Sequence, residues 1–249
     1  MTSPTALRPL PRQRRHTVHF LGSLAGRAPV HLDAEADVTA VLGRRETDPG
    51  APSITAYVVQ AVATTLFLHP EANSAYHAVP FPLLARNEGV DVKVAFDVEI
   101  AGVRTVQSGL LRDAVGLTAY QVHEWITDSA RALRGGRSGR AALLGLLPTA
   151  VGRRVFRAAV GPLTRRRALG TVSVTSLAHR PVSRIHSDGG TTVTVGIGRP
   201  TARPVIRSGE VEIREILPLS LTFDHRALDG ALAADVLATL VSVLERTTA

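Results

Sequence analysis

The sequence predicts an α+β fold with a mixed or antiparallel β-sheet and helices packed on one face of that sheet. Two patterns support this prediction: segments that alternate apolar and polar residues, as strands do, and segments with the spacing of amphipathic helices. The two kinds of segment do not alternate one for one along the chain, and we find no internal repeat. The 249 residues suffice to bury a core as one large domain or two small ones.

The N-terminal part predicts an arm followed by a strand. Residues 1–20 are basic and rich in proline, with no periodicity before Val18. Residues 30–38 then place apolar side chains at every second position, which is typical of a half-buried strand. We therefore expect an arm over residues 1–20 and a single domain over residues 21–249.

A helix and a central strand follow. Ser53 can cap the helix, which has one apolar stripe. The helix ends at His69, because the next residue is a proline. The clearest strand covers residues 90–100, with apolar side chains on one face and charged ones on the other. Thr118 and Gln121 then form the capping box of a second amphipathic helix.

The C-terminal part predicts more strands and a last helix. Strand patterns cover residues 170–177, 191–197 and 211–223. Residues 230–245 have the apolar spacing of a helix that packs on the sheet. The chain therefore ends with a strand that leads directly toward a helix.

Positive charge is concentrated in one insertion. The net charge is +8, but residues 134–168 hold nine arginines and no acid, whereas the other 20 basic residues face 21 acids. Because the charge belongs to one segment and not to the fold, we expect no nucleic-acid partner. The insertion is compatible with an anionic membrane surface, an acidic partner, a cover over an acyl pocket, or a solvated pair of helices.

Composition excludes several kinds of protein. Without cysteine there are no disulfides, thiolate metal sites or cysteine nucleophiles. No apolar run approaches the roughly 20 residues of a membrane helix. The N-terminus lacks the apolar core of a signal peptide, so we expect a cytoplasmic protein. The histidines show no metal-ligand spacing with acids on one helix face, and we expect no metal site.

The candidate catalytic motif lies at residues 219–230, where an alternating strand leads into His225. Asp229 follows four residues later and can fix the turn, and Gly230 can let the backbone bend sharply. A histidine held at a strand end can act as a general base, since its pKa lies near neutrality. The pattern alone also fits a structural histidine in a turn.

This motif resembles the His-x-x-x-Asp-Gly signature of the 2-oxoacid dehydrogenase E2 acyltransferases, which chloramphenicol acetyltransferase shares. Other blocks resemble the E2 catalytic domain in the same order and over nearly the whole chain, namely the basic arm and residues 30–38, 61–73, 90–100, 170–177 and 195–198. The resemblance implies a chloramphenicol acetyltransferase-like fold, with a mixed sheet flanked by helices.

The resemblance also implies residue roles. His225 would be the general base, and the Thr175 hydroxyl would stabilise the oxyanion where the family uses serine. Asp229 would order the active-site turn by pairing with an arginine of the N-terminal arm. The supporting candidates are Ser176, Arg226 and Gly230.

The implied function is a stand-alone acyltransferase that moves an acyl group between a coenzyme A thioester and a thiol, hydroxyl or amine acceptor. Coenzyme A would be the substrate as acyl-CoA, and the acceptor a small molecule or carrier-bound group. We expect no covalent lipoyl group and no subunit-binding domain on this chain. The resemblance implies a homotrimer with sites at subunit interfaces.

Two other functions stay open at this point. The domain could be a non-catalytic trimeric scaffold or partner-binding module that keeps the fold without the reaction. It could also be a basic peripheral membrane protein that acts through residues 134–168. Arg104 and Gln107 replace apolar residues of the family's substrate channel, which leaves the acyl group and the acceptor open.

Overall fold

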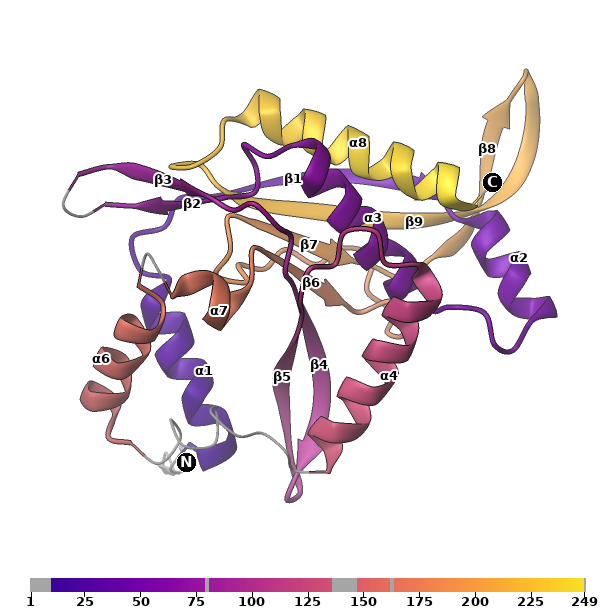
Figure 1. Cartoon of the computed structure of the whole chain (residues 1–249). Coiled ribbons are helices and arrows are strands. Elements are labelled where there is room, and N and C mark those ends of the chain that lie inside the picture. The colour runs from indigo at the N-terminus through magenta and orange to yellow at the C-terminus, as the bar shows by residue number, and fades with distance from the viewer. Residues whose placement is uncertain (1–9, 79–80, 136–146, 162–163, 249) are drawn as a thin grey trace, which may run out of the picture.

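The structure is a computed structural model that describes residues 10–78, 81–135, 147–161 and 164–248. It confirms the predicted α+β class (Figure 1). Its helices are α1 (Arg12–Ser23), α2 (Thr39–Thr47), α3 (Ile54–Leu68), α4 (Ala119–Arg134), α6 (Thr149–Ala159), α7 (Arg165–Leu169) and α8 (Gly230–Thr248). Its strands are β1 (Pro29–Asp37), β2 (Ser74–His77), β3 (Leu83–Arg86), β4 (Val92–Ile100), β5 (Val103–Leu111), β6 (Val172–Ser176), β7 (Val193–Ile197), β8 (Thr201–Arg207) and β9 (Glu210–Asp224).

The main sheet is mixed, as expected. Its order is β1-β9-β7-β6-β4-β5, and β8 pairs with the N-terminal part of β9. Strands β4, β6 and β7 are parallel, while the remaining pairs are antiparallel. Strand β9 therefore runs from the protruding β8–β9 hairpin into the main sheet, where it lies between β1 and β7 (Figure 1). We find no helix among the described residues that is long and apolar enough to span a bilayer.

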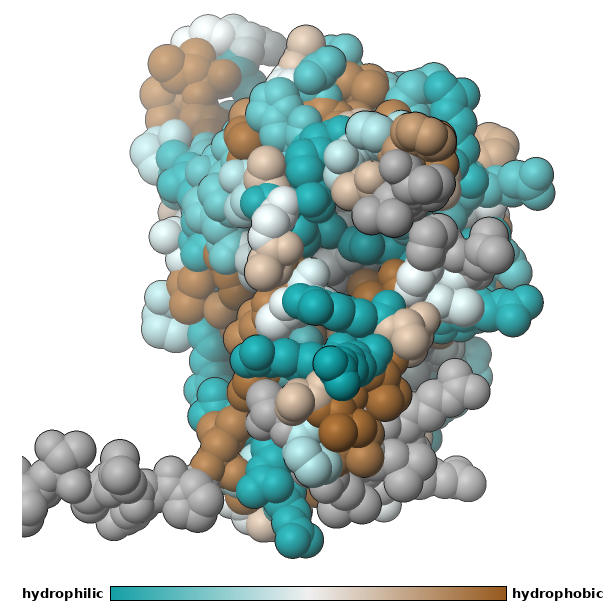
Figure 2. Space-filling view, turned by 90° about the vertical axis from the view of Figure 1, so that its left-hand side faces the viewer, coloured by the Kyte–Doolittle hydropathy of each residue, from teal (hydrophilic) through white to brown (hydrophobic). Residues whose placement is uncertain are grey.

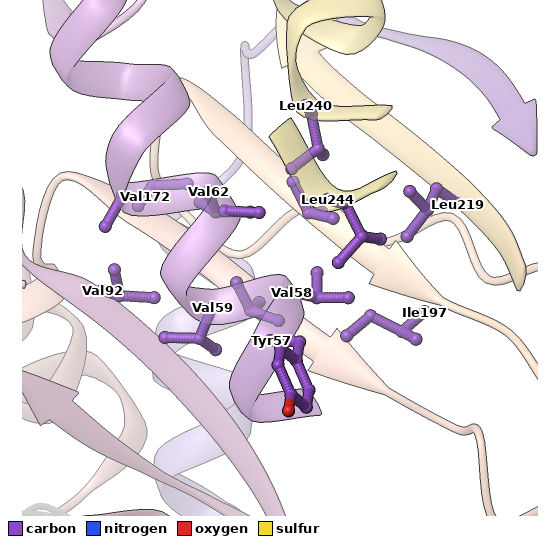
Figure 3. Close-up of a cluster of buried hydrophobic side chains, with 14 of the residues drawn as sticks. Tyr57, Val58, Val59, Val62, Val92, Val172, Ile197, Leu219, Leu240 and Leu244 are labelled. Carbon is purple, nitrogen blue, oxygen red and sulfur yellow. The ribbon is translucent and has the colours of Figure 1, made fainter. Parts of the chain in front are cut away.

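Helices α3 and α8 cover one face of the sheet and form the core with it. Val58 and Val62 of α3 meet Leu240 and Leu244 of α8 above Ile197 of β7 (Figure 3). Each of these side chains is at most 1% exposed. Full burial of such a side chain contributes about 1.5–3 kcal/mol, so this layer stabilises the packing of the two helices on the sheet.

The opposite face of the sheet is polar yet buried. The segment between β6 and β7 lies on it: Ser173 Oγ donates to Gly189 O (3.2 Å), and Gly189 N donates to Thr194 Oγ1 (2.9 Å). A Cβ on Gly196 would lie 2.1 Å from Ile185 O, so only glycine permits this close approach. The segment that connects the parallel strands β6 and β7 is thus held against the sheet by hydrogen bonds and close backbone packing.

The helix boundaries predicted from the sequence are confirmed. Ser53 caps α3 by accepting a hydrogen bond from Ala56 N, and α3 ends at Leu68 with His69 as its C-cap. The capping box of Thr118 and Gln121 opens α4. Local hydrogen-bond chemistry sets these ends, which is why the sequence predicts them.

Other elements were not predicted. The described part of residues 1–20 contains most of α1, where the sequence predicts an arm without periodicity. This helix packs on α6, with the rings of Phe20 and Phe156 6.2 Å apart, so it depends on a contact distant in the sequence. The unpredicted elements also include α2, β2, β3, β5 and β8.

The arginine-rich insertion has two different parts, apart from residues 136–146 and 162–163, which lie outside the described residues. On α6, Arg153, Arg154 and Arg157 are exposed. On α7, Arg166 instead forms two hydrogen bonds with the buried Asp91, at 2.9 and 3.1 Å. Part of the positive charge therefore stabilises the domain itself.

Candidate functional site

His225 lies directly after the last residue of β9, at the end of the central sheet. Its backbone N–H donates to Ala28 O (2.8 Å), and its ring lies 5.5 Å from that of Phe223. The side chain is 45% exposed. The histidine is thus fixed through its backbone and one ring face, while its ring remains accessible to a substrate.

Asp229 lies close to His225 but does not hold it tightly. Its Oδ1 is 3.8 Å from His225 Nδ1, which is beyond hydrogen-bond length, and its side chain is 91% exposed. We find no arginine beside Asp229 among the described residues, so the pairing implied by the resemblance is not present within one chain. Because water screens the exposed carboxylate, this ion pair contributes little to the stability of the turn.

Gly230 differs from its predicted role. It is the first residue of α8 and is not among the glycines with positive φ. A Cβ at this position would meet nothing within 4 Å. The predicted sharp bend is therefore absent, because the chain enters the helix directly.

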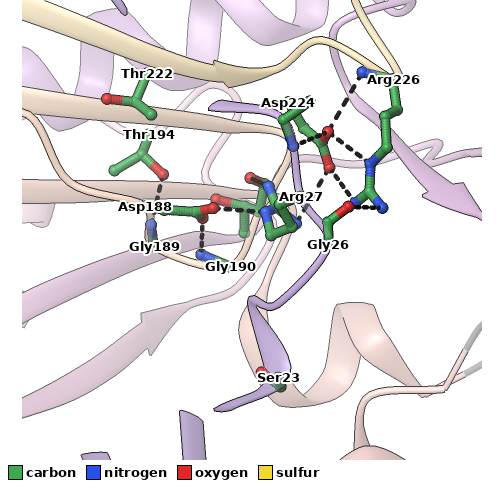
Figure 4. A network of polar contacts seen from close by, with 12 residues as sticks. Ser23, Gly26, Arg27, Asp188, Gly189, Gly190, Thr194, Thr222, Asp224 and Arg226 are labelled. Atoms are coloured by element: carbon green, nitrogen blue, oxygen red, sulfur yellow. Dashed lines mark hydrogen bonds and ion pairs between the residues drawn. The ribbon is translucent and has the colours of Figure 1, made fainter. Parts of the chain in front are cut away.

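The arginine partners belong to Asp224, the residue before His225. Its side chain is 2% exposed and accepts hydrogen bonds from Arg226 Nε (2.9 Å) and Nη2 (2.7 Å). Arg27 Nη1 lies 3.5 Å from the same carboxylate (Figure 4). Burial alone would raise the pKa of Asp224, but the hydrogen bond from Arg226 and the charge of Arg27 outweigh burial and lower it.

This network ties three segments together at the strand end. Arg27 Nε donates to Asp188 Oδ2 (2.6 Å), and its Nη2 donates to Thr191 O (2.6 Å). Arg226 Nη1 donates to Gly26 O (2.6 Å), and its guanidinium lies 4.7 Å from the ring of Tyr76. The supporting candidate Arg226 therefore holds the segment beside His225.

Thr175 lies far from His225 within one chain. It pairs with Gly196 on β7, which pairs with Ser220 on β9, five residues before His225. Five positions along a strand and two strand spacings separate the two Cα atoms by roughly 20 Å. Thr175 is half-buried on the polar face, as predicted, but one chain does not bring it to the histidine.

The Ser176 hydroxyl has a structural partner. Thr55 Oγ1 donates to Ser176 Oγ (3.1 Å), which links β6 to α3. This bond uses an acceptor position of the Ser176 oxygen and leaves its O–H free to donate. For Thr175 we find no side-chain hydrogen bond among the described residues.

Other polar features lie outside this site. His69 Nε2 and Thr239 Oγ1 are 2.8 Å apart, so His69 packs and caps as expected. We find no cluster of metal ligands among the described residues. A cavity of about 570 Å³ lies between residues 181–184 and β8, and neither His225 nor Thr175 lines it.

The ion-pair network is not predicted by the sequence. Asp224 and Arg226 flank His225 in the motif, and this proximity was the available signal. Arg27 and Asp188 are distant in the sequence, and no local pattern distinguishes them from surface charges. Only the fold brings them to the strand end.

Comparison with known proteins supports the resemblance. The family of the 2-oxoacid dehydrogenases acyltransferase (catalytic domain) matches residues 188–249, which include His225 and Asp229. The chain is 28% identical over 235 residues to the dihydrolipoyllysine-residue acetyltransferase component of the acetoin cleaving system of Bacillus subtilis (strain 168). That match covers 90% of this chain and 51% of the relative. The chain thus spans about half the length of the curated relatives it matches.

Solved structures confirm the fold. The chain is similar to an Azotobacter vinelandii dihydrolipoamide acetyltransferase (E2p), studied for the role of a serine, a histidine and an asparagine in its catalytic mechanism. The TM-score is 0.76 at 19% identity, covering 98% of this chain and 93% of that one. A chloramphenicol acetyltransferase matches with a TM-score of 0.51 at 14% identity, covering 97% and 96% of the two chains.

Proposed function

Because this chain is related to the catalytic domain of the 2-oxoacid dehydrogenase acyltransferases, we propose that it is an acyltransferase. It moves an acyl group between a coenzyme A thioester and a thiol, hydroxyl or amine acceptor. The observation that carries this proposal is the position of His225. Its side chain is half-exposed at the end of β9, and its backbone is fixed beside a buried ion-pair network.

His225 acts as the general base. The acceptor loses its S–H, O–H or N–H proton to the imidazole while its heteroatom bonds to the thioester carbonyl carbon. When the carbonyl re-forms, the C–S bond breaks and the imidazolium returns the proton to the coenzyme A thiolate. General-base catalysis of this kind contributes roughly 10²–10⁴-fold to the rate.

The oxyanion of the tetrahedral intermediate needs a donor, and Thr175 of a neighbouring subunit supplies it. The separation of Thr175 and His225 within one chain supports this arrangement, because one subunit alone leaves the site incomplete. The protein is accordingly a homotrimer with a site at each interface. One such hydroxyl contributes about 3–4 kcal/mol to the transition state.

Asp229 orders the active-site turn beside His225. Its carboxylate faces His225 Nδ1 at 3.8 Å. The similar Azotobacter vinelandii enzyme has an asparagine among the residues studied for its mechanism, which suits a group that orients without transferring protons.

The test is coenzyme A release from a panel of acyl-CoA thioesters with alcohols or amines as acceptors. The chain has no cysteine, so a thiol reagent detects only released coenzyme A. Dihydrolipoamide is tested as acceptor by chromatographic separation of acyl-dihydrolipoamide from acyl-CoA, because this transfer converts one thioester into another. We expect turnover that His225→Ala abolishes and that His179→Ala, at an exposed histidine outside the site, leaves intact.

The same assay distinguishes the alternative of a non-catalytic trimeric scaffold. A scaffold gives no turnover with any pair, and its assembly is unchanged by His225→Ala. Equal turnover in the wild type and in His225→Ala would contradict general-base catalysis even if acyl transfer occurs.

A second candidate function belongs to α6, which carries exposed Arg153, Arg154 and Arg157 beside Val151 and Val155. The face of the molecule that carries α6 shows hydrophilic and apolar residues side by side (Figure 2). This arrangement favours binding to an anionic membrane surface. Sedimentation with anionic liposomes should fall when the three arginines become glutamine, and equal binding of the variant would exclude this function.

A further inference from the structure

We propose that Lys93 and Arg165 form a binding site for a phosphate group. The site lies beside the ion-pair network at the end of β9, next to His225. Lys93 is the only lysine of the chain and lies near the start of β4. Arg165 is the first residue of α7. Both side chains are partly buried and reach the turn at Gly189 and Gly190.

The charges of this region do not balance. Four cations, Arg27, Lys93, Arg165 and Arg226, interact with one another or with the carboxylates of Asp188 and Asp224.

The two carboxylates are already occupied. Asp188 binds Arg27 at 2.6 Å, and Asp224 binds Arg226 at 2.7 Å. Lys93 and Arg165 make no ion pair with a carboxylate among the described residues. Two positive charges therefore remain uncompensated.

The donors of these two cations are largely unused. Lys93 Nζ donates to Gly189 O and lies 4.9 Å from the ring centroid of Phe20. Arg165 Nη2 donates to Gly190 O. An ammonium has three N–H donors and a guanidinium five, so most of them have no protein acceptor in the described residues.

The surroundings penalise the two charges. Burial lowers the pKa of Lys93 to about 8, with Asp188 opposing this and Arg165 and Arg27 adding to it. Burial and the charge of Arg27 lower the pKa of Arg165 as well. Unpaired cations away from water are costly, and an anion between them removes both the repulsion and the unmet hydrogen-bonding capacity.

His77 is a third polar group that interacts electrostatically with Arg165. Its Nε2 is buried without a hydrogen-bond partner in the described residues. Burial, followed by the charge of Arg165, lowers the pKa of His77. This environment favours the neutral imidazole, which can donate one N–H to an anion.

The chemistry of the donors points to phosphate. A guanidinium binds two oxygens of one group through its planar fork, and an ammonium adds a compact point charge. The phosphate has two sources: the free ion, or a phosphate group of coenzyme A. The second source rests on the proposed function, whereas the site itself does not.

The first experiment measures melting temperature in inorganic phosphate against chloride at equal ionic strength. Phosphate should raise the melting temperature of the wild type and of Arg154→Gln, whose arginine is exposed on α6. Lys93→Gln and Arg165→Gln should lose this response. Because Lys93→Gln removes a repelled charge, it should also melt at or above the wild-type temperature without phosphate. Equal phosphate responses in all four proteins would overturn the proposal.

A second measurement follows the lysine itself. Reductive methylation with ¹³C-formaldehyde keeps the charge of Lys93 and labels this one lysine and the α-amino group. The spectrum of Lys93→Gln identifies the signal of the α-amino group, which titrates in the same range. The NMR titration of Lys93 should give a pKa near 8, and phosphate should raise it, since a bound anion favours the ammonium. A titration curve that phosphate does not move would contradict the site.

Kinetics then separate the two sources. If a coenzyme A phosphate occupies the site, Lys93→Gln raises KM for acyl-CoA about tenfold and leaves KM for acyl-pantetheine, which lacks phosphate, unchanged. If the wild type and Lys93→Gln have equal KM values for acyl-CoA, and phosphate still raises the melting temperature of the wild type, the site is assigned to free phosphate. If no acyl transfer is found at all, the melting and NMR results still decide the site, so the two proposals fail separately.

Discussion

Thr175 and His225 occupy opposite ends of the central sheet: Thr175 is aligned, through Gly196, with the position five residues before His225. The two residues also belong to opposite faces of the sheet. Thr175 lies on the polar face with Ser173, whereas His225 follows two residues after Phe223, which is buried on the apolar face. One chain cannot place both side chains on the same acyl group. The proposed reaction therefore requires a second subunit, and this requirement can be tested directly.

Mixing two inactive variants should restore activity. His225→Ala lacks the base, and Thr175→Val lacks the hydroxyl at nearly the same volume. In trimers reassembled from equal amounts, about a quarter of the interfaces combine an intact His225 with an intact Thr175. Turnover at about a quarter of the wild-type value would support the shared site. Turnover no higher than that of the separate variants would contradict it, and Thr175→Ser should stay active on its own.

Asp224 should affect the reaction through the position of His225. Asp224→Asn weakens the contacts with Arg27 and Arg226 and leaves their charges without a buried partner. We expect kcat to fall roughly tenfold with little change in KM, because the strand end loses its anchor. Asp188→Asn is the matched control, since it removes the other carboxylate of Arg27 without touching the His225 turn. Equal losses of kcat in both variants would exclude a specific positioning role for Asp224.

The sequence predicts those parts of the fold that local chemistry determines. The Ser53 cap, the capping box at Thr118 and the alternating strand at residues 90–100 follow from neighbours along the chain, and the structure has all of them. Helix α1 was not predicted because it depends on the contact between Phe20 and Phe156.

In the candidate site, too, the sequence predicts the local features and not the long-range contacts. The motif identifies His225 and Asp229, but it assigns the arginine partner to Asp229, whereas the structure assigns it to Asp224. Arg27 and Asp188 reach the site only because the segment after α1 and the β6–β7 connection meet at the end of β9. Such long-range ion pairs leave no periodic signal in the sequence.

Asp91 should control stability at acidic pH. Burial alone would raise its pKa, but hydrogen bonds from Arg166, from the backbone of Asp113 and from Arg112 lower it. A lowered folded-state pKa stabilises the protein above the unfolded value of about 4, and this stability is lost as the pH falls below that value.

The test for Asp91 is thermal unfolding between pH 7 and pH 3. Asp91→Asn should lower the free energy of unfolding at pH 7 by about 2–4 kcal/mol, since two partly exposed arginines lose their carboxylate. The variant should also lose less stability on acidification than the wild type. Asp128→Asn, whose salt bridge is exposed, should change neither quantity measurably. Parallel pH profiles of Asp91→Asn and the wild type would contradict the assignment.

Two glycines should respond oppositely to alanine, although the one in the motif is the more conspicuous in the sequence. At Gly196 a Cβ would lie 2.1 Å from Ile185 O and 2.4 Å from Ser220 Oγ, and the backbone oxygen cannot move without displacing the β6–β7 connection. Gly196→Ala should therefore cost about 3 kcal/mol or more of unfolding free energy. At Gly230 a Cβ meets nothing, and alanine in the first turn of α8 should stabilise the protein by about 0.5–1 kcal/mol. Chemical denaturation of both variants checks this pair of predictions, and a destabilised Gly230→Ala would mean that the motif glycine is needed for a backbone shape that α8 does not show.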